Sequence, residues 1–225
     1  MDWHKWHNAY DQNPALKKRL ALVRKHLSRC LDRSAPGEVR IIGVCAGDGR
    51  DVLQTLADHK RFADARVRLV ELDPNLVADG EDACQALGLS NYVQFVNGDA
   101  TDSGSYRAVA PANIVLMCGM LGLVDLPELP NVVRAMQALC AHKGHVVWTR
   151  RLDWRDGVRQ TKLLQELMAK AGFRRAALNV TSFGVLFSKT PGPSFTVGTH
   201  RYEDEPVALP ESGRLFAISD ACIEQ

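Results

Sequence analysis

Short apolar runs alternate with helical repeats along most of this chain of 225 residues. The apolar runs predict strands at 39–45, 66–72, 92–97, 113–118 and 145–150. Helical spacing predicts helices at 16–31, 49–59, 75–87, 129–141 and 158–170. Strands that alternate with helices form right-handed crossovers, so we expect an α/β fold with a doubly wound, mostly parallel sheet and helices on both faces.

The pattern changes after residue 170. Two aromatic-rich stretches, NVTSFGVLFSK (179–189) and PSFTVGTHRYE (193–203), are separated by a break rich in proline around Gly192. We expect them to form an antiparallel pair that closes the sheet. The acidic end of the chain is expected to run back along the periphery.

The first predicted helix has an apolar stripe and basic remaining faces. Its apolar residues recur at helical spacing: Leu16, Leu20, Val23, Leu27 and Leu31. Its basic residues fall on the other faces: Lys17, Lys18, Arg19, Arg24, Lys25 and Arg29. Charges opposite an apolar stripe are typical of a solvated face, although the same face could track RNA or lipid.

Length and charge limit the kind of partner. The chain suits one globular domain, which we place at 36–225, preceded by a helical lid or cap segment at 1–35. The balance of 28 basic and 26 acidic residues, a net charge of +2, creates no strong field toward nucleic acid or an anionic membrane. We therefore expect a small-molecule substrate, no membrane association, and a monomer or homodimer.

Cysteine usage and the chain start indicate a compartment. The six cysteines include no Cys-x-x-Cys pair, which favours reduced thiols over a disulfide framework or a zinc site. The opening MDWHKWHNAYDQ is unlike a signal peptide, and the longest apolar run, 114–124, is too short to span a bilayer. The sequence predicts a cytoplasmic protein.

Polar residues and glycines follow four of the predicted strands. In open sheets of this kind, ligands bind beyond the carboxyl ends of the strands. Gly47 and Gly49 let the backbone approach a ligand, and the helix after them offers free amides to an anion. Glu71 is placed to hold both hydroxyls of a ribose, and Asp99 to accept a bond from an adenine amine. The stretch CGMLG (118–122) predicts an apolar floor.

The glycine turn does not match a dinucleotide or phosphate loop. Gly-x-Gly-x-x-Gly would need a glycine where Val52 stands. Asp48 would also place a carboxylate beside a pyrophosphate, and no Lys-Ser/Thr pair follows. A ligand with ribose and adenine but no phosphate fits better.

In this order and spacing, GVCAGDGRD, LVELDP, VQFVNGDATD and ANIVLMCG resemble the motifs of class I S-adenosylmethionine-dependent methyltransferases, over about 39–150. WHNAY and SFTVGTHRY resemble a little-characterised bacterial subgroup of small-molecule methyltransferases. The resemblance implies a seven-stranded Rossmann-like sheet with one reversed strand. It also implies S-adenosylmethionine as cofactor and S-adenosylhomocysteine as product.

The resemblance further implies which residues hold the cofactor. The loop after the first strand would hold the methionine part, Glu71 the ribose, and Asp99 with Ala100 the adenine. The full expected set is Cys45, Ala46, Gly47, Gly49, Glu71, Leu72, Asp99, Ala100, Cys118 and Gly119. One departure stands out, because Gly43 occupies the place where the family usually has an acid. Asp48 or a water-mediated contact would have to hold the cofactor's amino group instead.

The implied reaction is in-line attack of a nucleophile on the sulfonium methyl group. Alignment and exclusion of water can supply most of the acceleration, so we expect no metal. A hydroxyl or ammonium nucleophile would benefit from a base near neutral pKa. His7 or Tyr10 is our expected proton acceptor, on a helical face shared with Trp3 and Trp6 that could cover the substrate. The same residues could instead pin a helix to the core.

The acceptor is expected to be small and fairly apolar or aromatic. The Asn/Asp-Pro-Pro-aromatic run of nucleic-acid adenine methyltransferases is replaced by CGML. The expected substrate-binding residues are Trp3, Trp6, Met120, Leu121, Arg151, Trp154 and Phe183. A secondary metabolite methylated on oxygen or nitrogen is the leading hypothesis. An RNA methyltransferase and a non-catalytic cofactor-binding sensor or partner protein stay open as alternatives.

Overall fold

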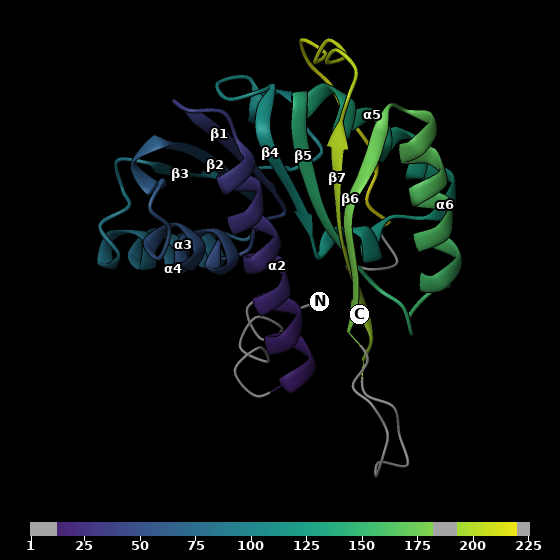
Figure 1. Cartoon of the computed structure of the whole chain (residues 1–225), viewed down its shortest axis with the longest axis horizontal. Helices are drawn as coiled ribbons and strands as arrows, with labels where there is room; N and C mark the ends of the chain where they lie inside the picture. Colours follow the sequence, from purple (N-terminus) through teal and green to yellow (C-terminus); the bar gives the residue numbers. More distant parts are fainter. Residues whose placement is uncertain (1–12, 182–192, 220–225) are drawn as a thin grey trace.

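A mixed sheet of seven strands forms the centre of the molecule (Figure 1). The computed structural model describes residues 13–181 and 193–219. The strands are β1 (Val39–Val44), β2 (Ala65–Glu71), β3 (Val93–Asn97), β4 (Ala112–Cys118), β5 (Cys140–Arg151), β6 (Phe173–Thr181) and β7 (Phe195–Tyr202). Their order is β3-β2-β1-β4-β5-β7-β6, and β7 runs antiparallel to both of its neighbours. The doubly wound sheet with one reversed strand is confirmed.

Five α-helices of the described residues accompany the sheet, and all five were predicted from their spacing. They are α2 (Pro14–Arg33), α3 (Arg50–Ala57), α4 (Pro74–Ala86), α5 (Leu129–Leu139) and α6 (Gly157–Lys170). Short 3-10 turns include η3 (Ser103–Tyr106), η4 (Met120–Leu123) and η5 (Leu126–Glu128). Among the described residues, no helix combines the length and apolar character needed to cross a membrane.

The sheet separates two hydrophobic layers. Because neighbouring strand residues point to opposite faces, Ile41 joins the layer under α2, α3 and α4, whereas Ile42 joins the layer under α5 and α6. Both side chains are fully buried. The central strands are therefore apolar on both faces, which explains why they read as nearly continuous apolar runs in the sequence.

The predicted start of the β6 strand is wrong. The sequence placed the first partner of the antiparallel pair at 179–189, whereas β6 begins at Phe173 and pairs with β7 up to the Thr181–Phe195 position. Gly172, with φ of +83°, ends the α6 segment and turns the chain directly into the strand. Phe173 then stacks on Tyr202 with 4.5 Å between ring centroids. Residues 182–192 lie outside the described residues.

Helix α2 packs across one face of the sheet (Figure 1). It begins after Asn13, whose side-chain oxygen accepts the Ala15 N–H at 2.9 Å, a typical N-cap. Two polar side chains lie on its buried face: Arg19 is 5 % exposed and His26 is 2 % exposed. The expectation that Arg19 belongs to a solvated face is therefore wrong, since its spacing from Leu16 and Val23 places it on the packed face.

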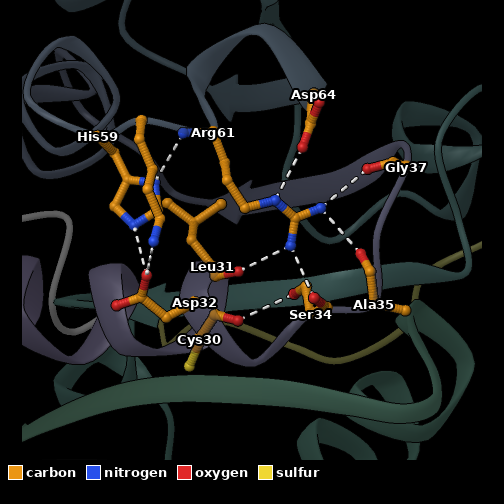
Figure 2. A network of polar contacts seen from close by, with 10 residues as sticks. Cys30, Leu31, Asp32, Ser34, Ala35, Gly37, His59, Arg61 and Asp64 are labelled. Carbon is orange, nitrogen blue, oxygen red and sulfur yellow. Dashed lines mark hydrogen bonds and ion pairs between the residues drawn. The ribbon is translucent and has the colours of Figure 1, made fainter.

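A network around Arg61 holds the carboxyl end of α2 (Figure 2). All five N–H groups of the Arg61 guanidinium donate hydrogen bonds, and Nε donates to Asp64 at 2.8 Å. The other four reach the carbonyl oxygens of Leu31, Ser34, Ala35 and Gly37 at 2.7 to 3.0 Å. These carbonyls belong to the last turn of α2 and the link to β1, where a helix leaves acceptors without internal partners. One side chain thus fixes this link.

We expect Arg61→Met to lower the free energy of unfolding by roughly 2 to 4 kcal/mol, because several charge-assisted hydrogen bonds to partly buried carbonyls are lost together. Urea unfolding followed by circular dichroism measures the change. Arg66→Met, on an exposed arginine of β2, is the matched control and should change stability by less than about 0.5 kcal/mol. Equal stability of the two variants would contradict the role given to Arg61.

Two histidines are buried within the β5 and β7 pair. The Trp148 indole N–H donates to Nδ1 of His200 at 3.1 Å, which requires that nitrogen to be unprotonated. Burial lowers the pKa of His200 to about 4, with the Arg175 charge adding to the effect. Burial also lowers the pKa of His145 to about 4, helped by Arg201 and Arg33. Both rings are therefore neutral at pH 7.

We expect the free energy of unfolding to fall as the pH drops from about 6.5 to about 4. Histidine in the unfolded chain takes up a proton near pH 6.5, whereas folded His145 and His200 take it up only near pH 4. In that window the unfolded chain binds more protons, so acid favours unfolding by roughly 2 to 3 kcal/mol per histidine. Urea titrations at several pH values measure the slope.

The double variant His145→Gln/His200→Gln should lose most of this slope. His142→Gln, on an exposed ring, is the control and should keep it. An identical slope in the wild type and the double variant would show that these two rings do not govern the acid response.

Candidate functional site

The carboxyl ends of four adjacent strands bring the predicted cofactor residues together. Because β3, β2, β1 and β4 are neighbours in this order, Asp99, Glu71, the Cys45–Gly49 loop and Cys118 follow one another along one edge of the sheet. The connections from β1 and β4 depart to opposite faces, and such a switch point is where open α/β sheets bind ligands. The sequence prediction of four converging strand ends agrees with this arrangement.

The loop after β1 is a left-handed turn. Cys45, Gly47 and Gly49 all have positive φ, at +51°, +59° and +68°. A Cβ atom on Gly49 would lie 2.6 Å from the Leu69 side chain and 2.9 Å from Phe95, so this position accepts only glycine. Cys45 also has a positive φ although it carries a side chain, and a glycine would adopt this backbone conformation with less strain.

Glu71 ties this loop to the end of β2. Its Oε2 accepts the Gly47 N–H at 2.8 Å, and its Oε1 accepts the N–H groups of Leu72 and Asp73 at 2.9 and 3.0 Å. The side chain is 8 % exposed. A carboxylate oxygen can accept two hydrogen bonds, so Oε2 keeps capacity for a ligand hydroxyl. Leu72, directly after it, is 66 % exposed and offers an apolar surface at the strand end.

Asp99 lies on an exposed turn after β3. Its Oδ1 accepts hydrogen bonds from the Thr101 N–H and hydroxyl, both at 2.8 Å. A buried side chain holds this turn: the Tyr106 hydroxyl donates to the Ala100 carbonyl at 2.6 Å. The chain near the carboxyl terminus also reaches it, with the Leu215 N–H donating to the Thr101 carbonyl at 2.7 Å. Asp99 is thus fixed while remaining open to solvent.

The place of the absent acid is closed by packing. A Cβ atom on Gly43 would lie 2.7 Å from Leu69 Cδ2 and 3.3 Å from the Ala46 Cβ. A carboxylate side chain at this position would require the Leu69 side chain to move. Asp48, the expected substitute, faces the Arg50 guanidinium, whose Nε donates to both of its oxygens at 2.8 and 2.9 Å. The negative charge of Asp48 is therefore largely compensated.

Two charged residues that were not predicted for the site lie near this edge. The Arg19 side chain of α2 reaches the end of β5, where its Nε donates to Thr149 Oγ1 at 3.3 Å. Asp51 stands in the first turn of α3, with Oδ1 accepting the Val52 N–H at 2.9 Å. The position of Arg19 within the apolar stripe of α2 could have identified it as buried. Asp51 gave no such signal, because an acidic residue in the first turn of a helix is favourable there in any protein.

The two thiols at the site are neutral. Burial is the main cause that raises the pKa of both Cys45 and Cys118, with Glu71 and Asp51 respectively adding negative charge nearby. A protonated thiol is a weak nucleophile, so these cysteines act as small apolar groups. Within residues 13–181 and 193–219, no three histidine, cysteine or carboxylate side chains gather closely enough to hold a metal ion.

The predicted acceptor side is only partly open. Met120 and Leu121 are each 1 % exposed and belong to the hydrophobic layer under α5, so a role as a floor stays a prediction. Trp154 is half-buried, and a Cβ atom on Gly122 would lie 2.8 Å from its ring. Arg151 is exposed and forms an ion pair with Asp153 at 2.7 Å. The remaining predicted residues lie outside the described residues: Trp3, Trp6, His7, Tyr10 and Phe183.

Comparisons with known proteins agree with this fold. A family profile described as "Putative methyltransferase" matches residues 15–149. No curated protein matches the sequence. Among solved structures, the CurJ carbon methyltransferase is similar with a TM-score of 0.66 and 12% identity, over 90% of this chain and 59% of that one.

Two further solved structures are similar over most of their length. Magnesium protoporphyrin IX methyltransferase (ChlM) from Synechocystis PCC 6803, solved with bound S-adenosylhomocysteine, has a TM-score of 0.64 and 13% identity, covering 89% of this chain and 94% of that one. The [4+2]-cyclase SpnF has a TM-score of 0.57 and 16% identity, covering 84% and 82%. At such identities these likenesses show the fold alone.

The family match spans more than half of the chain, from α2 to β5. It includes the loop after β1, the ends of β2, β3 and β4, and Arg19. The strand order and the reversed β7 agree with it independently. This chain therefore belongs to that methyltransferase family and has the class I S-adenosylmethionine-dependent methyltransferase fold.

Proposed function

We propose that this protein transfers a methyl group from S-adenosylmethionine to an oxygen or nitrogen atom of a small, fairly apolar or aromatic metabolite. The observation that carries the proposal is the row of Asp99, Glu71, the Cys45–Gly49 loop and Cys118 along one sheet edge. Along the strand ends, these groups could bind in turn an adenine, a ribose and an amino-acid chain. The loop after β1 lacks the motif of a phosphate-binding loop.

Contacts of the described residues support such a ligand. Glu71 Oε2 would accept a ribose hydroxyl while keeping its bond to the Gly47 N–H. The exposed Asp99 carboxylate would accept the adenine amine, beside the apolar surface of Leu72. Gly47 and Gly49 would let the loop backbone approach the methionine part.

The protein's part in the reaction is positioning and exclusion of water. Bound S-adenosylmethionine supplies an electrophilic methyl group on its sulfonium. The rigid strand ends would hold this methyl group in line with the acceptor atom, which supplies much of the acceleration in a displacement. The neutral Cys45 and Cys118 thiols and buried Met120 would keep the surroundings apolar.

The proposed proton acceptor is His7 or Tyr10, which lie outside the described residues. Among residues 13–181 and 193–219, the histidines are engaged away from the strand carboxyl ends: His26, His59, His142, His145 and His200. His26, for example, contacts Thr199 Oγ1 at 2.7 Å in the middle of the sheet. This supports His7 or Tyr10 as the group that takes the acceptor's proton.

Trp154 supports an aromatic acceptor. Two guanidinium groups lie over its ring, with the guanidinium carbons of Arg150 and Arg155 at 6.0 and 5.7 Å from the ring centroid. Arg155 is held in turn by Asp125 at 3.3 Å. The indole is therefore fixed next to the chain that leaves β4, where an acceptor facing the methyl group would lie.

Two alternatives follow from other observations. An RNA acceptor would use the exposed basic residues of α2, which are Lys17, Lys18, Lys25 and Arg29. Binding to RNA would then weaken steeply with salt. A similar fold is found in SpnF, which is named as a [4+2]-cyclase and not as a methyltransferase. Cofactor binding without turnover over a wide acceptor panel would favour a sensor or partner role.

Calorimetric titration tests the cofactor assignment. We expect S-adenosylmethionine and S-adenosylhomocysteine to bind the wild type and NAD to give no heat. Glu71→Gln should weaken both by about tenfold or more, because an acceptor that is ionised is lost. Glu81→Gln, on the exposed face of α4, is the control and should bind as the wild type does. Binding of NAD, or of none of these ligands, would exclude the proposed function.

Turnover tests the proton acceptor. On any acceptor that the wild type methylates, His7→Ala or Tyr10→Phe should reduce the single-turnover rate by about a hundredfold or more, since general-base assistance contributes that much. His142→Ala lies at the opposite edge of the sheet and should leave the rate unchanged. Wild-type rates in both variants would remove His7 and Tyr10 from the mechanism.

A further inference from the structure

Helix α2 places a buried positive charge at the carboxyl ends of β4 and β5. The Arg19 side chain is 5 % exposed, and its guanidinium carbon lies 5.7 Å from the centroid of the Phe195 ring. Its Nε donates to Thr149 Oγ1 at the carboxyl end of β5. Taking a guanidinium out of water is costly, so its retention at a strand end points to a task there.

The Arg19 guanidinium abuts the end of β4. A Cβ atom on Gly119 would lie 3.4 Å from the Arg19 Nη2, and Gly119 is itself exposed with φ of +110°. Gly119 has no side chain, so its backbone can lie close to this nitrogen. Gly119 directly follows Cys118 in the row of residues that faces the proposed cofactor.

Asp51 supplies the opposite charge in the same region. It is the second residue of α3 and follows the Gly49 turn. Burial lowers the pKa of Arg19 while the Asp51 charge raises it, and burial raises the pKa of Asp51 while the Arg19 charge lowers it. The two charges therefore act on each other across the ends of β1 and β4.

An α-amino acid carries the same two charges at fixed separation. The proposed cofactor ends in such a group, with an ammonium and a carboxylate on one carbon. Gly43 supplies no carboxylate and is packed against the Leu69 side chain, and the Asp48 carboxylate faces the Arg50 guanidinium. Asp51 is then the carboxylate of the loop region that remains for the ammonium.

We propose that Arg19 and Asp51 together bind the amino-acid end of S-adenosylmethionine, Asp51 through its ammonium and Arg19 through its carboxylate. This inference rests on the proposed function. Charge-assisted hydrogen bonds of this kind are about twice as strong as neutral ones, and the start of α3 lies beside the site. The pair also explains how α2, a helix far from the loop in sequence, completes the cofactor site.

Three ligands separate the two contacts. S-adenosylhomocysteine has both charges, S-adenosyl-3-thiopropylamine has the ammonium alone, and 5′-methylthioadenosine has neither. Calorimetric titration is carried out on the wild type, Arg19→Met and Asp51→Asn. Arg29→Met on the exposed face of α2 and Asp58→Asn at the end of α3 are the matched controls.

We expect Arg19→Met to weaken the binding of S-adenosylhomocysteine by about tenfold to a hundredfold. The affinities for the amine and for methylthioadenosine should stay within about threefold of the wild-type values. Asp51→Asn should weaken the binding of S-adenosylhomocysteine and of the amine by a similar factor, and should leave the affinity for methylthioadenosine unchanged. Both controls should bind all three ligands as the wild type does.

Retained binding of methylthioadenosine shows that a variant has kept its adenosine site. Unfolding curves are measured for each variant, and Arg19→Gln or Asp51→Ser replaces one that lacks a cooperative transition. Unchanged binding of S-adenosylhomocysteine, or equal loss of all three ligands by a folded variant, would overturn the pairing of these charges with the amino-acid end. If the wild type bound none of the three ligands, the proposed function itself would be rejected.

Discussion

The parallel pairing of β1 with β4 in the centre of the sheet creates the switch point at which open α/β sheets bind ligands. Ile41, Ile42 and Gly43 pair with Ile114, Val115 and Leu116 of β4, and the two strands then send the chain to opposite faces. The loops separate at that point, and backbone groups at the strand ends become available to a ligand. The Cys45–Gly49 turn and Gly119 occupy this opening, with Glu71 and Asp99 on the strands beside it.

Helix α2 connects this central opening to the rim of the domain. At its carboxyl end, the Arg61 guanidinium fixes the last carbonyl groups and the link to β1. Near its amino end, Arg19 reaches Thr149 and approaches Gly119. The same rigid helix thus joins a stabilising network at one edge of the sheet to a buried charge at the other, and Arg19 is placed by packing rather than by a loop.

The sequence specified the strand-end residues well and the packed polar residues poorly. Glu71 and Asp99 could be predicted because strands that alternate with helices must place their carboxyl ends together. Arg19 could not be recognised from charge alone, since only the three-dimensional contact with Thr149 shows why a guanidinium is buried. The closed space at Gly43 depends on Leu69 of a neighbouring strand. The early start of β6 was missed because its exposed arginines hide the strand pattern.

A crystal structure of the protein with S-adenosylhomocysteine tests the central claim most directly. The account predicts adenine beside Asp99, ribose hydroxyls within hydrogen-bond distance of Glu71, and the amino-acid end between Asp51 and Arg19 at the ends of β1 and β4. Ligand density at another face of the sheet, or an amino-acid end that points away from both charges, would contradict it.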